Sequence, residues 1–291
     1  MKKTKEKIIK YILATFGSIS VFVTIGIFLI LIYESLAFFK QVPLTEFLFS
    51  KQWTPLLNPK HYGIASLLSG TFLIVVFSSL ISIPIGLLSS IYLSEYADKR
   101  VRKVIKPLLE ILAGIPSIVY GFFALTTITP ILQNIFPQTS IYNALSAAIA
   151  VGVMTLPMVA SLSEDSMQAV PNSLREAAYA LGLTKQETVR GVVLPAAISG
   201  IISSFILAIS RAIGETMIVA LAAGSNPKLT LNPLESIQTM TGFIAQVSQG
   251  DIAQGSLESQ TLYVVGLVLF LLTLSMNVLA RYITNKMREE Y

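Results

Sequence analysis

Six long runs of apolar residues restrict what this chain can fold into. Each run reaches the roughly 20 residues that an α-helix needs to cross the hydrocarbon core of a bilayer. Hydrophobic residues make up 53% of the chain and charged residues 13%, a balance typical of a membrane protein. We therefore expect an all-α membrane protein with six transmembrane helices. The runs cover approximately residues 11–39, 64–92, 108–132, 142–162, 196–223 and 262–283.

The first apolar run begins after five lysines, as the apolar part of a secretory signal peptide also does. In a signal peptide, however, that part is about 7–15 residues long and ends in small residues. Here it continues from Tyr11 to Phe39 and ends in two phenylalanines. We predict an uncleaved first transmembrane helix.

The distribution of lysine and arginine predicts the orientation of the helices. Cytoplasmic segments of membrane proteins carry an excess of these residues. Six crossings place 16 of the 21 such residues on one side, in the segments 2–10, 99–106, 175–190 and 281–288. We therefore expect a multi-pass protein of the cell (cytoplasmic) membrane with both termini inside. The polar segment 163–195 then lies in the cytoplasm.

The residues that the chain lacks argue against several functions. It has no cysteine and a single histidine, His61, so we expect neither thiol chemistry nor a metal site. It has no G-x-x-x-x-G-K-[S/T] loop, so ATP energy is expected to come from a separate subunit. We expect no catalytic residues in this chain and no nucleic-acid partner, since its net charge of +5 reflects the cytoplasmic cations. In the outer loop 40–63, Trp53 is interpreted as an interfacial anchor and His61 as a solvated side chain.

Two adjacent helix signals mark the cytoplasmic segment. Ser173 with Glu176, and Thr184 with Glu187, are each spaced as capping boxes that begin a helix. Gly182 falls where a helix end favours positive φ. Leu174, Ala177, Ala178 and Leu181 share one face of the first helix, and we interpret them as an apolar ridge offered to a groove on another protein. A helical turn between membrane spans is the alternative.

Arg211 and Glu215 are charged residues inside the fifth apolar run. A charge at bilayer depth costs about 2.5–3.5 kcal/mol, so such residues normally face a bundle interior or an aqueous path. One turn apart, the two can pair on a helix face, which would be a purely structural role. Alternatively, Arg211 attracts an oxyanion and Glu215 holds its side chain. Hydroxyl groups that could line the same path belong to Ser117, Thr155, Ser210 and Thr216, although each could instead bond within its own helix. Glu95 and Glu110 are expected to pair with the basic loop 99–106.

The cytoplasmic segment resembles the coupling loop of ABC importer permeases. Glu-Ala-Ala is followed after three residues by Gly, after nine more by an aliphatic residue, and after one more by Leu-Pro. The resemblance implies that this segment docks on the ATPase subunit. The residues that carry it are Glu176, Ala177, Ala178, Gly182, Val192, Leu194 and Pro195.

Further segments resemble the PstC family, the C-type permeases of phosphate importers. They are Trp53-Thr54-Pro55, Tyr62-Gly63-Ile64, Ser69-Gly70-Thr71, the stretches 91–97 and 110–121, and Arg211-Ala212-Ile213-Gly214-Glu215-Thr216. The resemblance implies the type I (MetI-like) permease fold and roles for Arg211 and Glu215 in phosphate passage. It also implies a heterodimer with a PstA-type permease, two copies of a PstB-type ATPase that bind ATP and magnesium, and an external phosphate-binding protein.

These observations predict a division of the chain and a mechanism. We expect a first helix and outer loop at 1–63, a permease core at 64–283 and a cytoplasmic tail at 284–291. ATP binding by the partner would displace the helix at 174–182 and open the bundle outward, and hydrolysis would reset it. An importer of molybdate, sulfate or phosphonate is one alternative. A stand-alone secondary transporter or channel is another.

Overall fold

The computed structural model describes residues 2–286, and its regular elements are helices. Within that range the sole β-pairing is an isolated bridge between Trp53 and Tyr62. The π-helical turns are labelled η. The elements are α1 (Lys2–Phe39), α2 (Leu44–Phe49), α3 (Ala65–Ile91), η1 (Tyr92–Tyr96), α4 (Lys99–Gly114), α5 (Ser117–Phe123), η2 (Ala124–Ile128), α6 (Thr129–Ile135), α7 (Ala144–Gln168), α8 (Asn172–Ala180), α9 (Lys185–Thr188), η3 (Val189–Val193), α10 (Leu194–Ile213), α11 (Met217–Ala222), α12 (Met240–Gln249) and α13 (Leu257–Lys286).

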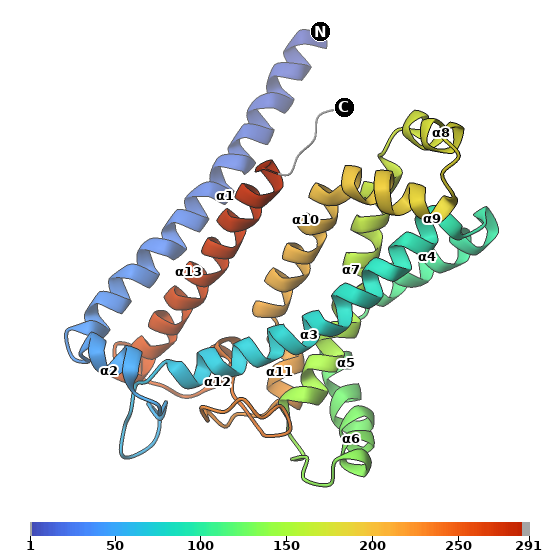
Figure 1. The fold of residues 1–291 in the computed structure, drawn as a ribbon. Coiled ribbons are helices and arrows are strands. Elements are labelled where there is room, and N and C mark those ends of the chain that lie inside the picture. Colours follow the sequence, from blue (N-terminus) through green and yellow to red (C-terminus); the bar gives the residue numbers. More distant parts are fainter. Residues whose placement is uncertain (1, 287–291) are drawn as a thin grey trace.

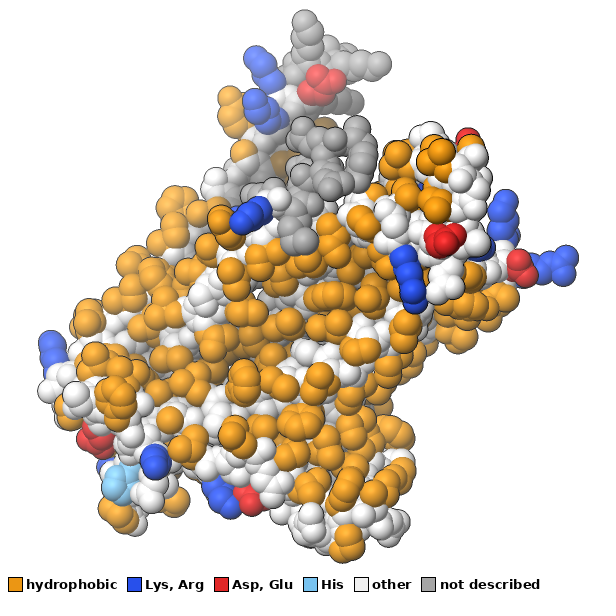
Figure 2. Space-filling model, in the orientation of Figure 1, with side chains coloured by type: hydrophobic (Ala, Val, Ile, Leu, Met, Phe, Trp, Pro, Cys, Tyr) orange, Lys and Arg blue, Asp and Glu red, His pale blue; other side chains and the backbone are white. Residues whose placement is uncertain are grey.

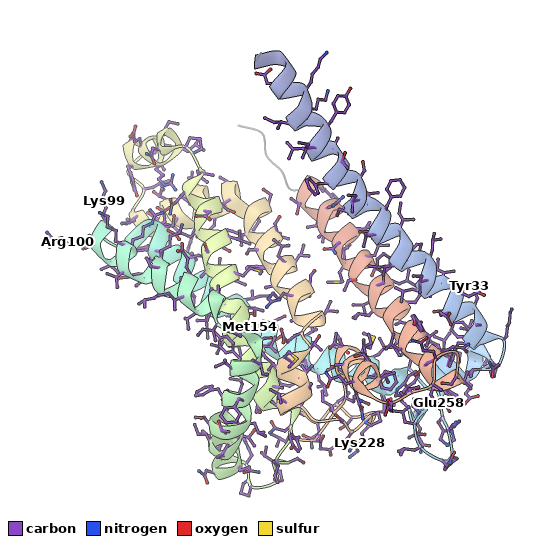
Figure 3. The ribbon with its side chains drawn as sticks, turned by 180° about the vertical axis from the view of Figure 1, so that it is seen from behind. Tyr33, Lys99, Arg100, Met154, Lys228 and Glu258 are labelled. Carbon is purple, nitrogen blue, oxygen red and sulfur yellow. The ribbon has the colours of Figure 1, made fainter. Side chains whose placement is uncertain are left out.

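Six helical stretches are long and apolar enough to cross a membrane, which confirms the predicted number. The beginning of α1, the end of α13 and α8 lie at one end of the molecule, and α2, α12 and α6 lie at the other (Figure 1). Lys99 and Arg100 lie toward the α8 end, whereas Lys228 and Glu258 lie at the opposite end (Figure 3). The expected tail 284–291 falls largely outside the described residues. The six stretches are Ile9–Phe39, Ala65–Tyr96, Ser117–Ile135, Ala144–Gln168, Lys185–Ile213 and Leu257–Thr284.

The sequence led us to expect one continuous helix over the third apolar run, but the structure shows an interruption there. α4 ends at Gly114, and the chain is extended at Ile115 and Pro116 before α5 begins. The residue before a proline avoids the α region, so Pro116 separates the two helices. The basic segment 99–106 is therefore the first half of the amphipathic helix α4, and the prediction of a loop at these residues is wrong.

α3 and α7 cross closely at the centre of the bundle, and α10 packs against both (Figure 1). Glycines at the crossing allow this approach. A Cβ on Gly152 of α7 would lie 3.1 Å from the Ser78 carbonyl oxygen of α3, and one on Gly86 of α3 would lie 2.7 Å from the Val159 side chain. Small residues permit such close contact between membrane helices. α3 and α7 consequently form one tightly packed pair.

α1 lies apart from this pair and packs along α13 (Figure 1). The Phe28 and Phe270 rings join the two helices, with centroids 5.1 Å apart. Most of the apolar side chains of α1 are exposed. Hydrophobic side chains also spread over the middle of the face shown in Figure 2, as expected of a surface that lies in lipid.

Trp53 belongs to a buried aromatic cluster, so its interpretation as an interfacial anchor is wrong. Its side chain is 1% exposed and packs edge-on against Phe243 of α12 and Phe47 of α2, with ring centroids 5.1 and 6.2 Å apart. The outer loop 40–63 is thus folded onto α12. His61 is half-buried, and its backbone carbonyl accepts a hydrogen bond from Thr54.

Because Trp53 is the sole tryptophan, its fluorescence reports on this cluster directly. We expect blue-shifted emission that iodide quenches poorly, and we expect Trp53→Ala to lower the free energy of unfolding by about 3–5 kcal/mol. Trp53→Phe, which keeps an aromatic ring, should cost less. Emission typical of exposed indole in the native protein would contradict this packing.

Candidate functional site

The cytoplasmic segment forms two short helices joined at Gly182. Gly182 has φ +83°, and the helix end is closed by hydrogen bonds from the Gly182 N–H to the Tyr179 oxygen and from the Leu183 N–H to the Ala178 oxygen. The predicted capping box of Thr184 and Glu187 is confirmed. The box expected at Ser173 is wrong, because α8 begins at Asn172 after Pro171, which presets the extended entry to the helix.

The apolar ridge expected on α8 is divided between two faces. Leu174 packs on the buried cluster of Met167, Val170 and Val193, and Ala178 is also buried. Ala177 and Leu181 are exposed, Leu181 to 84%. A helix of nine residues needs contacts with its own protein to keep its place, and half of the ridge supplies them. The exposed half, with Tyr179, is the surface left for another protein.

Arg175 holds α8 against the ends of two membrane helices. Its guanidinium forms an ion pair with Glu95 of η1 at 2.9 Å, and it donates to the carbonyl oxygens of Met167 at 2.8 Å and Val170 at 2.6 Å. The Arg175 and Glu95 side chains are 14% and 6% exposed. We had expected Glu95 to pair with the basic segment 99–106. It pairs instead with Arg175 of α8. We did not single out Arg175 from the sequence, where nothing connects it with Glu95.

A second ion-pair network joins α4 to α7. Glu164 is fully buried and accepts from Arg102 Nε at 2.7 Å and from Gln168 Nε2 at 2.6 Å, with Lys106 Nζ at 3.5 Å. Lys106 also donates to Asp165 at 2.9 Å, and this bond and the nearby Glu164 raise the pKa of Lys106. Glu110 is exposed and has no ion-pair partner among residues 2–286, contrary to expectation.

We expect Glu164→Gln to loosen α4 from α7, because Arg102 and Lys106 lose the charge that they share. Hydrogen bonds to charged groups contribute about 1.5–3 kcal/mol, and thermal unfolding in detergent should show a loss of this size. Glu110→Gln, an equivalent change at an exposed position of α4, should alter stability by no more than about 0.5 kcal/mol. Equal unfolding temperatures for the two variants would refute the network.

Arg211 and Glu215 do not form the expected ion pair. α10 ends at Ile213, and the chain turns at Gly214. Glu215 lies just before α11, and its buried carboxylate accepts hydrogen bonds from the N–H groups of Met217 at 3.1 Å and Ile218 at 3.2 Å. Because the helix is interrupted, the two side chains do not share a helix face. Glu215 fixes the start of α11.

Arg211 is left as an exposed cation at the end of α10. Within the described residues its side chain makes one polar contact, from Nη2 to the Met154 sulfur of α7 at 3.6 Å. Met154 lies in the middle of the bundle (Figure 3). Nearly all N–H donors of the Arg211 guanidinium are therefore available to a molecule that reaches this part of the bundle.

The other polar residues expected along a path divide into two groups. Ser210 and Thr216 lie beside the α10 break; the Ser210 hydroxyl is buried with no described partner, and Thr216 donates to the Gly214 oxygen at 3.2 Å. Ser117 begins α5, which packs on α11. Thr155, in contrast, donates to the carbonyl oxygens of Val151 and Gly152 within its own helix.

The first residues of α12 and the loop before them fasten the α10 break to α3. The Thr241 hydroxyl donates to the Glu215 backbone oxygen at 2.6 Å, and the Met240 N–H donates to the Thr71 hydroxyl of α3 at 3.1 Å. A Cβ on Gly70 would lie 2.3 Å from the Gln238 carbonyl oxygen, so α3 touches this loop directly. The break that carries Arg211 is thus attached to the outer end of α3.

Six membrane-crossing helices, with a short surface helix pinned to the helix ends and a cation at a break within the bundle, indicate a multi-pass membrane protein. Residues 82–289 match the model of the binding-protein-dependent transport system inner membrane component. The chain belongs to this family, and it is an inner-membrane permease subunit of an ABC importer with the MetI-like fold.

Individual relatives agree with this assignment. The chain is 35% identical to the probable ABC transporter permease protein YqgH of Bacillus subtilis, over 83% of this chain and 78% of that one. It is 32% identical to the phosphate transport system permease protein PstC of Mesorhizobium japonicum, over 81% and 77%. In structure it is similar to an inward-facing MetNI methionine ABC transporter, with a TM-score of 0.57 and 20% identity over 78% of this chain and 95% of that one.

Proposed function

We propose that this chain is the subunit through which inorganic phosphate crosses the membrane in an ABC importer. The observation that carries the proposal is Arg211, a guanidinium at a helix break inside the bundle, without an ion-pair partner in residues 2–286. A permanently charged donor fork at that depth matches an oxyanion. The similarity to phosphate transport system permeases supports phosphate as that oxyanion.

The polar groups around Arg211 have separate roles in this proposal. Arg211 attracts the anion, and the hydroxyl groups of Ser210, Thr216 and Ser117 supply neutral donors along the path. Glu215 acts as a positioning residue, because its carboxylate caps α11 and keeps the break in place. Thr155 is omitted from the path, since its hydroxyl is already bonded within α7.

The energy enters through α8. The exposed Ala177, Tyr179 and Leu181 would dock in a groove of the ATPase, which binds ATP and magnesium and performs the hydrolysis. Glu176, Gly182, Leu194 and Pro195 complete the coupling segment, with Gly182 closing α8 and Leu194 packed on the buried cluster. A PstA-type permease, two PstB-type ATPase subunits and an external phosphate-binding protein would complete the transporter.

Uptake of labelled phosphate into vesicles that hold this chain with those partners tests the function. We expect uptake that requires ATP and the binding protein and that excess sulfate, molybdate or phosphonate does not reduce. Stronger inhibition by one of these anions would assign the chain to that oxyanion. Uptake without an ATPase would instead indicate a secondary transporter or channel.

A further inference from the structure

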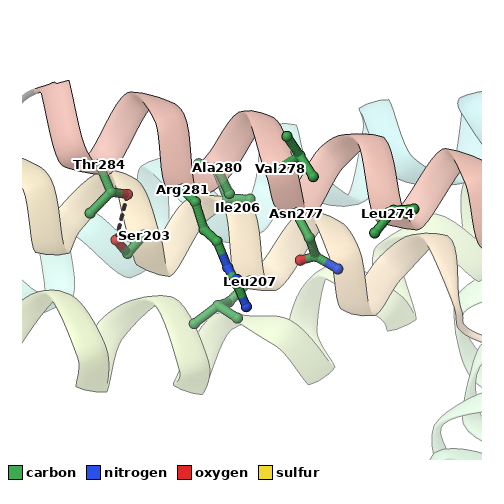
Figure 4. Close-up of a pocket in the computed structure, with 9 residues that line it drawn as sticks. All are labelled: Ser203, Ile206, Leu207, Leu274, Asn277, Val278, Ala280, Arg281 and Thr284. Carbon is green, nitrogen blue, oxygen red and sulfur yellow. Dashed lines mark hydrogen bonds between the residues drawn. The ribbon is translucent and has the colours of Figure 1, made fainter. Parts of the chain in front are cut away.

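A groove of about 590 Å³ opens between α10 and α13, away from the α10 break (Figure 4). Its lining is divided by chemistry. One part is polar, with Ser203, Asn277, Arg281 and Thr284, and the other is apolar, with Ile206, Leu207, Leu274, Val278 and Ala280.

Arg281 is the charged group of this groove. It extends from α13 across to α10, near Leu207 (Figure 4). Asn277 lies one turn before it on the same face of α13. The hydroxyl groups of Ser203 and Thr284 are hydrogen-bonded to each other at 3.0 Å, which joins the two helices at this end. Arg281 is exposed and forms no ion pair with a carboxylate in residues 2–286.

The position of the groove along α13 fixes its depth in the membrane. Arg281 lies three residues before the end of the apolar span at Thr284, on the side of the molecule where α8 lies, and we infer from this position that it is at the level of the cytoplasmic headgroups. Leu274 is seven residues deeper, which is about 10 Å at 1.5 Å per residue. The lining thus changes from charged at the headgroup level to apolar deeper in the membrane, in the same order as the headgroup and acyl chains of a phospholipid. Along α10, Ser203 is about 12 Å from Arg211 by the same rise, so this groove is separate from the proposed path.

We propose that this groove binds one anionic phospholipid of the cytoplasmic leaflet. The lipid phosphate lies on the Arg281 guanidinium with the Asn277 amide as a further donor, and an acyl chain follows Leu207, Leu274 and Val278. Basic pockets between transmembrane helices on the cytoplasmic side are typical sites for anionic headgroups. The phosphate neutralises a cation that the described protein leaves unpaired. The lipid also covers apolar surface in the gap between α10 and α13.

Photocrosslinking in the full membrane complex tests this site. The probes are phosphatidylglycerol and phosphatidylcholine that carry the same photoactivatable acyl chain. We expect phosphatidylglycerol to give adducts at 206–207 or 274–278, and phosphatidylcholine to give few. Arg281→Gln should lower the phosphatidylglycerol adducts about tenfold, the factor that corresponds to 1.4 kcal/mol of binding. Arg281→Lys should retain part of the binding because it keeps the charge.

The matched control is Arg100→Gln, which removes an exposed cation of α4 on the same side of the membrane (Figure 3). It should leave the adducts unchanged. Equal labelling by the two lipids, or unchanged labelling of Arg281→Gln, would overturn the proposal. Absence of adducts would show that a protein partner covers the groove. Displacement of phosphatidylglycerol by inorganic phosphate would show that the site binds the free anion instead.

Discussion

Replacing Arg211 by alanine is expected to lower phosphate uptake strongly while the transporter stays assembled. The side chain is exposed and its one described polar contact is with the Met154 sulfur, so its removal leaves no buried charge unpaired. The anion, in contrast, loses charged hydrogen bonds of about 1.5–3 kcal/mol, which amounts to a loss of at least about tenfold in uptake. Uptake of labelled phosphate and copurification of the ATPase are the two measurements.

The companion variants separate the charge of Arg211 from its shape and from its surroundings. Arg211→Lys keeps the charge without the planar fork and should transport at an intermediate rate. Glu215→Gln should reduce uptake only through the position of α11, since the amide oxygen can still accept from Met217 and Ile218. Normal uptake by Arg211→Ala would leave phosphate selectivity without a residue in this chain.

Arg175→Ala is expected to uncouple ATP hydrolysis from transport. The change leaves the Glu95 carboxylate buried without its partner and removes the donor of two carbonyl groups. Breaking a buried ion pair costs about 3–5 kcal/mol. α8 has only nine residues, and besides Arg175 it is held by the packing of Leu174 and Ala178, so the cost falls on its docking rather than on the whole fold. We expect the phosphate imported per ATP hydrolysed to fall more than about tenfold.

A double-mutant cycle identifies the ion pair as the cause. Arg175→Gln and Glu95→Gln should each reduce the ratio of transport to hydrolysis, and the double variant should lose much less than the sum. Arg190→Ala, which removes an exposed cation in the same segment, is the matched control, since Arg190 forms no ion pair within residues 2–286. Additive losses, or a normal ratio in Arg175→Ala, would mean that α8 is held by other contacts.

The membrane architecture was predictable because it depends on properties that neighbouring residues share. Runs of apolar residues predicted the six spans that the structure has, and the lysines and arginines predict which end faces the cytoplasm. Local capping chemistry also predicted Gly182 and the Thr184–Glu187 box. Pro116 carried a signal for the interruption of the third run that we did not use.

The contacts between distant parts of the chain could not be predicted in the same way. Glu95 and Arg175 are isolated charges in the sequence, and only the packing of η1 beside α8 makes them partners. Trp53 looked like an interfacial residue because its partner Phe243 lies in the last third of the chain. Gly214, which precedes Glu215, was a signal that the helix ends there. We predicted an ion pair instead, because Glu215 follows Arg211 by one helical turn in the sequence.

The close packing of α3 on α7 has a mechanical consequence. α3 is 27 residues long, or about 40 Å. Its cytoplasmic end continues into η1 and the Glu95–Arg175 pair, and near its outer end Thr71 is bonded to the start of α12, which also holds Glu215. If α3 and α7 move together as one rigid body, a tilt of a few degrees at the α8 end displaces the Arg211 region by ångströms. No side chains between α8 and Arg211 need to rearrange. Spin-label distances that change inside α3–α7 during the ATP cycle would argue against such a lever. In a rigid lever of this kind, the distance between the ATPase contact and the anion is an advantage, because a longer helix converts the same tilt into a larger displacement at its far end.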